Sequence, residues 1–264
     1  MAKTVLIPAA GSGSRFAQAG ITTPKPLIRV SGQTLLEHTL SSFCWSSNDR
    51  LILAVQKEHG IREELDPILR DKFPNLCIEW VELAGLLPGQ LATATRAIEA
   101  SAIPPNQILL IHNCDTGFHW NDQLDVIKGL ATMPVFEAKG DHWSFGKPDP
   151  RHPERAIAIA EKQRISPLAS IGLYGFRSAD DFLKRAKRQL SQGATLRGEH
   201  YIAPMLQGCI EAGEIVELPR VKGVRLFGTP QELCATFDIS LEQLKSQNRG
   251  APANHPPNRQ VAQN

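Results

Sequence analysis

The stretch from residue 5 to residue 36 constrains the fold of this chain more than any other. It begins with a short apolar run at residues 5–7, which is long enough for a buried strand and is followed by Pro8. Only small residues follow, so the backbone N–H groups there can come close to a phosphate. These small residues are Ala9, Ala10, Gly11, Ser12, Gly13 and Ser14. The chain is therefore expected to place an anion-binding loop directly after a buried strand.

Two cations follow this loop in the sequence. Arg15 comes directly after the small residues, and Lys25 stands between Pro24 and Pro26. Because proline fixes its φ angle, the backbone around Lys25 is held in a narrow range of conformations. The pattern predicts an arginine and a lysine that neutralise the charge of one bound phosphate group.

The glycine pattern does not fit the two best-known phosphate loops. A dinucleotide-binding fingerprint needs a third small residue three positions after Gly13, where this chain has Phe16, and no Gly-Lys-Ser/Thr sequence of a P-loop is present. A Gly-x-Gly after a strand is by itself weak evidence of binding, because glycine-rich turns are common in α/β proteins. A simple turn therefore remains the alternative at this point.

Composition narrows the class of protein. The 264 residues and a hydrophobic content of 42% suit one large globular α/β domain or two small ones. A net charge of +2 with both signs interspersed argues against a nucleic-acid partner. No stretch has the length of a signal peptide's apolar region or of a membrane span, so we expect no membrane partner and a cytoplasmic protein. Five cysteines without a Cys-x-x-Cys pair predict reduced thiols in the core.

Strand and helix patterns alternate through the first half of the chain. Apolar and β-rich runs predict strands over residues 51–55, 76–81 and 108–111, and helical periodicity predicts helices over residues 35–43, 58–69 and 89–103. Thr34 and Glu37 have the spacing of a capping box at the first of these helices. This alternation is typical of a parallel sheet with helices on both faces. The fold class predicted is α/β, a single Rossmann-like domain with a mostly parallel, mixed sheet.

The second half has a different pattern. Strand-like runs over residues 133–138, 155–160 and 169–176 are separated only by loops, which predicts an antiparallel or mixed extension of the sheet. Helices are expected from Ser178 onward and from about residue 199 or 201 to residue 212. From residue 245 to 264 large apolar residues are almost absent, so we expect a domain over residues 1–244 and a disordered tail over 245–264.

Asp115 is the candidate metal ligand. It follows the predicted strand 108–111, in the sequence Asn113-Cys114-Asp115. An acid at this point is often only a cap of a turn, but the carboxyl edge of a parallel sheet is also where ligands bind. Mg²⁺ is commonly held by one or two carboxylates together with substrate phosphates. The eight histidines show no His-Glu-x-x-His or similar spacing, so none is assigned to a metal.

Taken together, these motifs resemble those of the nucleotidyltransferases that activate sugar phosphates, the nucleoside-diphosphate-sugar pyrophosphorylases. The resemblance begins with Gly-x-Gly-x-Arg and the Pro-Lys-Pro-Leu that follows ten residues later, and it includes Asn-Cys-Asp at residues 113–115. Later parts of the chain also resemble this family, so that the resemblance spans about residues 4–240. These parts are residues 89–92, Trp143-Ser144-Phe145, Glu161-Lys162, residues 165–166 with Ala169, residues 172–176, residues 199–204 and residues 228–233, which begin with Gly-Thr-Pro.

The resemblance implies a reaction and a set of site residues. The reaction is transfer of a nucleoside monophosphate from a nucleoside triphosphate to a sugar phosphate or similar small phosphorylated alcohol, with release of pyrophosphate, as in the biosynthesis of nucleotide sugars for polysaccharides. Arg15 and Lys25 are then catalytic, Asp115 holds Mg²⁺, and Gly89 joins residues 9–14 in binding the nucleotide. The residues that the resemblance assigns to the acceptor are Ser144, Glu161, Lys162, Gly172 and Glu199.

One departure from the family leaves alternatives open. Many sugar pyrophosphorylases have a second Mg²⁺-binding acid two residues before the Gly of Gly-Thr-Pro, where this chain has Leu226. A non-catalytic nucleotide-binding relative is therefore one alternative. A nucleotide-sugar-dependent glycosyltransferase is another, although its Asp-x-Asp motif would need an acid at Asn113. The base of the nucleotide, the acceptor and any assembly into a homo-oligomer are left open.

Overall fold

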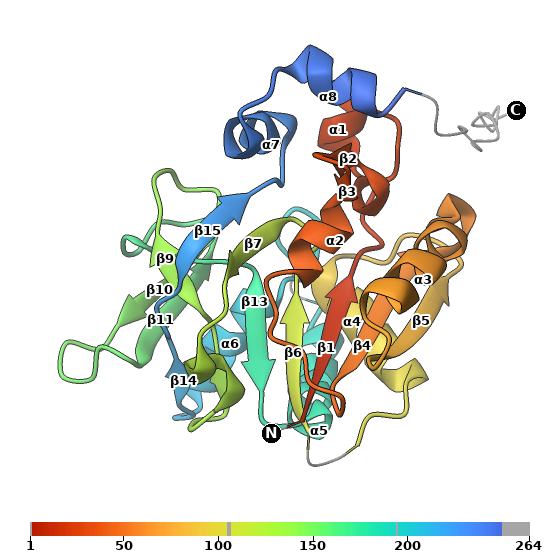
Figure 1. Ribbon diagram of the computed structural model, residues 1–264. Helices are drawn as coiled ribbons and strands as arrows, with labels where there is room; N and C mark the ends of the chain where they lie inside the picture. Colours follow the sequence, from red (N-terminus) through yellow and green to blue (C-terminus); the bar gives the residue numbers. More distant parts are fainter. Residues whose placement is uncertain (1, 105–106, 194, 250–264) are drawn as a thin grey trace, which may run out of the picture.

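The computed structural model describes residues 2–104, 107–193 and 195–249, and its centre is a seven-stranded sheet (Figure 1). The strand order is β14-β8-β13-β6-β1-β4-β5. The strands are β1 (Lys3–Pro8), β4 (Arg50–Gln56), β5 (Cys77–Leu83), β6 (Ile108–His112), β8 (Ala131–Thr132), β13 (Leu173–Phe176) and β14 (Val216–Glu217). Strand β13 runs antiparallel to both of its neighbours, and the other pairs in this sheet are parallel. The predicted α/β class with a mostly parallel, mixed sheet is confirmed.

Residues of β1 show why the sheet is covered on both faces. Val5 and Ile7 belong to one hydrophobic core and Leu6 belongs to another, as expected when successive side chains of a strand point to opposite faces. All three side chains are fully buried. A strand that is apolar on both faces has to be covered on both, which is the property of the parallel sheet predicted from the sequence.

Helices cover these two faces. Helices α2 (Leu35–Leu40) and α3 (Ile61–Lys72) supply side chains to the core on the side of Val5, and α4 (Gln90–Ala100), α5 (Ala179–Ser191) and α6 (Ile202–Glu211) supply side chains to the core on the side of Leu6. The predicted capping box of α2 is present, because Thr34 accepts from the backbone N–H of Glu37 and the Glu37 carboxylate accepts from that of Thr34.

Most of the strand-like runs predicted to extend the main sheet instead form a separate four-stranded sheet, so that part of the prediction is wrong. The order of this smaller sheet is β11-β10-β12-β9, and all of its pairs are antiparallel. These strands are β9 (Val135–Glu137), β10 (Ser144–Pro148), β11 (Ala156–Glu161) and β12 (Leu168–Ser170). The run predicted as one strand over residues 169–176 forms two, β12 and β13. Gly172 separates them with a φ of +76°, a conformation that a β-strand does not contain.

The C-terminal helices α7 (Pro230–Phe237) and α8 (Leu241–Gln247) pack near α1 (Ser14–Gln18), above the edge of the large sheet at which β1 ends (Figure 1). Leu244 and Phe16 are buried in the core that joins these helices. The backbone of Arg29 exchanges two hydrogen bonds with the side chain of Asn248. The domain boundary predicted at Leu244 therefore lies within α8, because an apolar residue and a polar anchor tie residues 245–248 to the domain. The rest of the predicted tail, residues 250–264, lies outside the described residues.

Shorter elements complete the described part of the chain. They are the 3₁₀ helices Lys25–Leu27, Lys57–His59 and Asp122–Asp125, and the strands β2 (Arg29–Val30), β3 (Gln33–Thr34), β7 (Thr116–His119) and β15 (Lys222–Leu226). The five cysteines are free, but Cys44 and Cys77 are exposed, so the prediction that all of them lie in the core is wrong. Within the described ranges, no helix is long and apolar enough to cross a membrane.

Candidate active site

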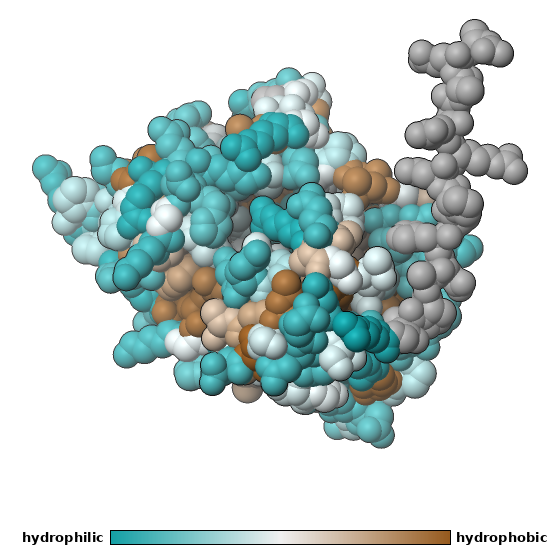
Figure 2. Space-filling model, turned by 90° about the horizontal axis from the view of Figure 1, so that it is seen from above, coloured by the Kyte–Doolittle hydropathy of each residue, from teal (hydrophilic) through white to brown (hydrophobic). Residues whose placement is uncertain are grey.

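The candidate site lies at the carboxyl ends of β1 and β6, where the strand order reverses. Strand β1 is flanked by β4 on one side and by β6 on the other, so the connections after β1 and β6 leave the sheet on either side of a crevice. Two cavities of about 490 Å³ and about 200 Å³ open there. Both are lined by Arg15, Gln90, Asn113, Asp115, Tyr201 and Gly228. Viewed from this side, the surface is mainly hydrophilic, with smaller hydrophobic areas (Figure 2).

The glycine-rich loop forms one wall of the larger cavity. Residues 9–14 all line it. The N–H of Ala9 continues the pairing of β1 with β4 by donating to the Ala54 carbonyl at 2.8 Å. Gly13 has a φ of +63° and precedes the first turn of α1, and no atom lies within 4 Å of the point that a Cβ on Gly11 would occupy. The loop thus presents its backbone and only small side chains to the cavity.

Lys25 and Asp115 meet at the centre of the site. The Lys25 Nζ lies 2.7 Å from Asp115 Oδ2, and the two side chains are 17% and 26% exposed. Burial alone would lower the pKa of Lys25, but the Asp115 carboxylate more than offsets this and raises it. Burial likewise would raise the pKa of Asp115, but Lys25 lowers it below its usual range. Both groups are therefore charged at neutral pH.

Leu226, which stands where many sugar pyrophosphorylases have a second acid, lies next to Asp115 in the structure. Strand β15 pairs Leu226 with Thr116, the neighbour of Asp115, and the N–H of Phe227 donates to the Asp115 carbonyl at 3.0 Å. Leu226 thus lies beside Asp115, where the resemblance places the second acid, and it adds no carboxylate. Among the described residues, no group of three or more histidine, cysteine, aspartate or glutamate side chains is arranged to hold a metal.

The groups next to Asp115 in the sequence are not nucleophiles. Burial raises the pKa of the Cys114 thiol to about 11. Burial also lowers the pKa of His112, which is fully buried and contacts the Thr116 carbonyl through Nε2 at 2.9 Å. A neutral thiol and a neutral imidazole support the backbone around Asp115, and neither is activated for covalent chemistry.

The smaller cavity contains several residues assigned to the acceptor. Ser144, Glu161 and Gly172 line it. The Ser144 hydroxyl donates to the Glu161 carboxylate and lies 3.2 Å from the Tyr174 hydroxyl. Burial raises the pKa of Glu161, although Ser144 opposes this. These groups form a polar wall that can exchange hydrogen bonds with a hydroxylated ligand.

The side chain of Lys162 does not line the cavity that its neighbour Glu161 lines. The φ of Lys162 is +54°, and its Nζ contacts the Tyr201 hydroxyl at 2.5 Å. The same hydroxyl donates to Glu199. Tyr201 lines both cavities, Glu199 lines the larger one, and Lys162 lines neither. The structure therefore brings Glu161 and Glu199 to the cavities, and it places Lys162 behind Tyr201.

Gly89 and Gly172 are required by close contacts within the protein. Gly89 has a φ of +98°, and a Cβ there would lie 2.6 Å from the backbone N and O of His200. Gly172 has a φ of +76°, and a Cβ there would lie 2.5 Å from the Asn113 side chain. Each glycine thus lets two walls of the site approach each other.

Several residues of the site were not assigned from the sequence. Asn113 lies in both cavities and accepts a hydrogen bond from the side chain of Gln90. His142 and Glu232 line the smaller cavity. The position of Asn113 two residues before Asp115 could have indicated it. Glu232 lies within the stretch 228–233 that resembles the family, but nothing in that stretch distinguishes it from an ordinary acid in the first turn of a helix.

The fold is α/β and Rossmann-like, with two cavities at the carboxyl edge of its sheet, and comparison with known proteins narrows this class. Residues 3–124 match the family of 2-C-methyl-D-erythritol 4-phosphate cytidylyltransferases. No curated protein matches the chain significantly.

Solved structures resemble most of the chain. A nucleoside-diphosphate-sugar pyrophosphorylase from Vibrio cholerae RC9 is 27% identical, with 89% of this chain and 99% of that chain covered and a TM-score of 0.75. An inositol-1-phosphate CTP transferase from T. maritima is 15% identical, covering 96% and 98% of the two chains with a TM-score of 0.69. A UDP-glucose pyrophosphorylase complexed with UDP-glucose is 14% identical, covering 90% and 98% with a TM-score of 0.69.

These comparisons confirm the resemblance to the sugar-phosphate nucleotidyltransferases. The first half of the chain agrees with that group in sequence, and the chain agrees with it in fold over most of its length.

Proposed function

We propose that this protein is a nucleotidyltransferase that joins a nucleoside monophosphate, taken from a nucleoside triphosphate, to a small phosphorylated acceptor and releases pyrophosphate. The observation that carries the proposal is the Lys25–Asp115 ion pair. Asp115 lines both the larger cavity, whose volume suits a nucleotide, and the smaller polar one. Charged groups at the junction of two binding cavities are placed to act on a phosphate that two substrates share.

The chemistry follows from this placement. An oxygen of the acceptor phosphate attacks the α-phosphorus of the triphosphate, and the bond from that phosphorus to the oxygen bridging to the β-phosphate breaks. The departing pyrophosphate carries additional negative charge. Arg15 and Lys25 lie beside the backbone loop of residues 9–14, where they can stabilise this charge. Catalysis of this kind depends on positioning and charge stabilisation, and it needs no nucleophile from the protein.

The residues present fit a magnesium ion. Asp115 is ionised because Lys25 lowers its pKa, and its carboxylate lines the cavity proposed for the triphosphate. A single carboxylate together with phosphate oxygens is a common way to hold Mg²⁺. We infer that Asp115 and the triphosphate hold the ion, which would neutralise phosphate charge when bound.

The N-terminal part of the chain, which contains the residues proposed to bind the nucleotide, suggests which base to test first. The family match to cytidylyltransferases covers residues 3–124, which contain the glycine-rich loop, Gly89 and Asp115. We therefore propose CTP as the first triphosphate to test. For the acceptor, the relatives suggest a sugar or polyol phosphate, which would place the reaction in nucleotide-sugar biosynthesis.

The two alternatives have weaker support. A glycosyltransferase would need an acid where Asn113 stands, and the Asn113 carboxamide is already paired with Gln90. A non-catalytic relative is suggested by Leu226, yet Arg15, Lys25 and Asp115 line one cavity together.

The test is pyrophosphate release by the purified protein with each nucleoside triphosphate and a panel of phosphorylated sugars and polyols. We expect release that depends on both substrates and nearly disappears in Asp115→Asn. Wild-type protein that releases no pyrophosphate with any pair, or that transfers sugar from a nucleotide sugar, would contradict the proposal.

A further inference from the structure

Glu232 is a carboxylate of the smaller cavity to which neither the resemblance nor the proposed chemistry assigns a role. It lies in the first turn of α7, where its backbone N–H donates to the Thr229 hydroxyl at 3.1 Å. The next residue, Leu233, is fully buried in the core that joins α7 to α1. The backbone of Glu232 is therefore held firmly by the helix cap and by the core.

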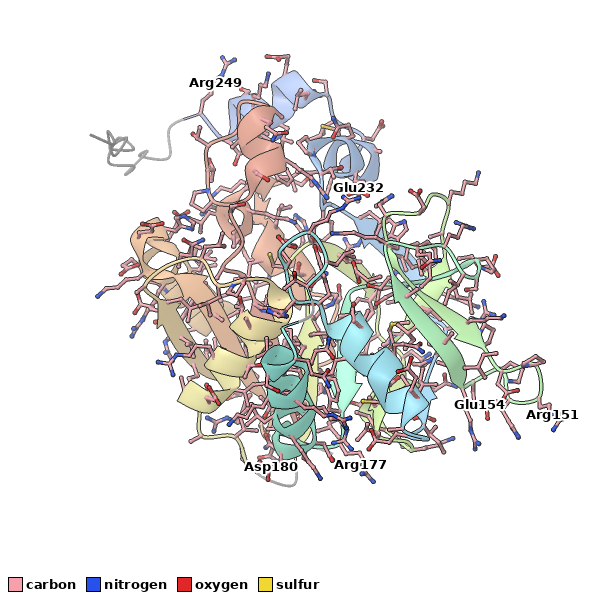
Figure 3. All side chains as sticks on the ribbon, turned by 180° about the vertical axis from the view of Figure 1, so that it is seen from behind. Arg151, Glu154, Arg177, Asp180, Glu232 and Arg249 are labelled. Carbon is pink, nitrogen blue, oxygen red and sulfur yellow. The ribbon has the colours of Figure 1, made fainter. Side chains whose placement is uncertain are left out.

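The side chain of Glu232 points toward the active site. Its position would allow it to complete a capping box with Thr229, but that reciprocal bond is not formed. Its Oε2 lies 3.2 Å from the point that a Cβ on Gly228 would occupy, and Asp115 Oδ2 lies at the same distance from that point. Figure 3 shows Glu232 at the end of α7 that faces the four-stranded sheet.

Glu232 also approaches the opposite wall of the cavity. Its Oε1 lies 3.6 Å from Nε2 of His142, in the loop before β10, and its side chain is 23% exposed. This separation is longer than a hydrogen bond, so the carboxylate can accept other donors. Glu232 thus stands between α7 and the sheet that carries Ser144 and Glu161.

The charges of the smaller cavity favour one kind of ligand. Its wall contains the carboxylates of Asp115, Glu161 and Glu232, and among its described lining residues Arg15 is the only lysine or arginine. Arg15 and Asp115 also line the larger cavity, so Glu161 and Glu232 are the charges that belong to the smaller cavity alone. Carboxylates accept hydrogen bonds from hydroxyl and ammonium groups, and they repel anions.

We propose that Glu232 binds the acceptor and, with Glu161, selects acceptors whose end remote from the phosphate carries hydroxyl or ammonium groups and no anionic group. This inference rests on the proposed function, because it places the acceptor in the smaller cavity. The volume of about 200 Å³ restricts that acceptor to a small molecule. Glu232 is then a specificity-determining residue contributed by helix α7.

The experiment compares three sugar phosphates that differ only at C6, the end remote from the phosphate. Glucose 1-phosphate has a hydroxyl there, 6-amino-6-deoxyglucose 1-phosphate has an ammonium group in its place, and glucuronate 1-phosphate has a carboxylate. Turnover is measured with the best triphosphate, and binding of each phosphate is measured by calorimetry with a non-hydrolysable analogue of that triphosphate present. The variants are Glu232→Gln and Glu232→Ala, with Glu242→Gln on the exposed surface of α8 as the matched control.

For the wild type we expect use of one or both of the first two phosphates and rejection of glucuronate 1-phosphate. Glu232→Ala should raise the acceptor KM and Kd by on the order of 10-fold or more, as expected for loss of a charged hydrogen-bond partner. The KM for the triphosphate and the unfolding temperature should stay close to wild type. Glu232→Gln should reduce the discrimination against glucuronate 1-phosphate, and Glu242→Gln should change nothing.

The outcomes separate the two proposals. Pyrophosphate release with acceptor KM and Kd unchanged in both Glu232 variants overturns the inference alone, as does equal use of the glucose and glucuronate phosphates by the wild type. Wild-type protein that neither turns over nor binds any of the three phosphates overturns the inference together with this choice of acceptor class. If another phosphorylated acceptor then supports turnover, the proposed function stands.

Discussion

Gly89→Ala should weaken both the fold and the active site, because Gly89 lies where two walls of the site are joined. The N–H of Leu91 donates to the His200 carbonyl at 3.0 Å, and the N–H of His200 donates to the Pro88 carbonyl at 2.9 Å. A methyl group on Gly89 would lie 2.6 Å from the backbone N and O of His200. The backbone around His200 would therefore have to move.

The size of the effect can be worked out from this geometry. A non-glycine residue at φ +98° costs about 1–3 kcal/mol, and each weakened hydrogen bond adds about 0.5–1.5 kcal/mol. With two hydrogen bonds weakened, the total is about 2–6 kcal/mol, which for a domain of this size lowers the unfolding temperature by roughly 4–24 °C. Because Glu199 and Tyr201 flank His200, the KM values of both substrates should rise.

Circular dichroism on heating and steady-state kinetics measure the two effects. Gly85→Ala is the matched control, since Gly85 has no positive φ and no atom within 4 Å of its missing Cβ, and it should behave as wild type. Gly89→Ala with wild-type unfolding temperature and unchanged KM values would refute the reasoning.

The remaining predictions concern charge, metal and the C-terminus. Lys25→Ala and Arg15→Ala should each lower kcat by on the order of 10²-fold, the scale for losing one charge-stabilising donor, with the fold retained; wild-type turnover in either variant would remove that residue from the mechanism. In calorimetry, Mg²⁺ should bind weakly to the free protein and tightly only with a non-hydrolysable triphosphate present, because one carboxylate, Asp115, is available; tight binding to free protein would contradict this. A chain ending at Arg249 should keep its unfolding temperature and activity, whereas one ending at Ser240 should unfold at lower temperature because α8 and its buried leucine are lost.

The elements that could be predicted from the sequence are those specified by local patterns. The continuous apolar runs became the parallel strands, and the Thr34–Glu37 spacing became a capping box, because both depend on residues close together in the chain. The Gly-x-Gly-x-Arg loop and Asp115 were expected at the carboxyl edge of the sheet, and both line the larger cavity there. A parallel topology brings successive strand ends to one edge, so their meeting follows from the fold class.

The features that were missed depend on contacts between distant segments. Nothing near Gly89 in the sequence indicates that residue 200 will lie against it. The direction of Lys162 follows from its positive φ and from Tyr201, neither of which a Glu-Lys pair indicates. The low apolar content after Leu244 concealed an anchor made by one side chain, Asn248, with backbone 219 residues away.

The most direct test of the central claim follows oxygen atoms through the reaction. The acceptor phosphate is labelled with ¹⁸O, and the products of the best substrate pair are identified by ³¹P NMR and mass spectrometry. Attack of the acceptor phosphate on the α-phosphorus predicts a product in which the acceptor is joined to the nucleoside through a diphosphate. This product should retain all of the label, including the oxygen that bridges its two phosphates, and the pyrophosphate should be unlabelled. Label in the pyrophosphate, or formation of nucleoside mono- or diphosphate with the acceptor unchanged, would contradict the account.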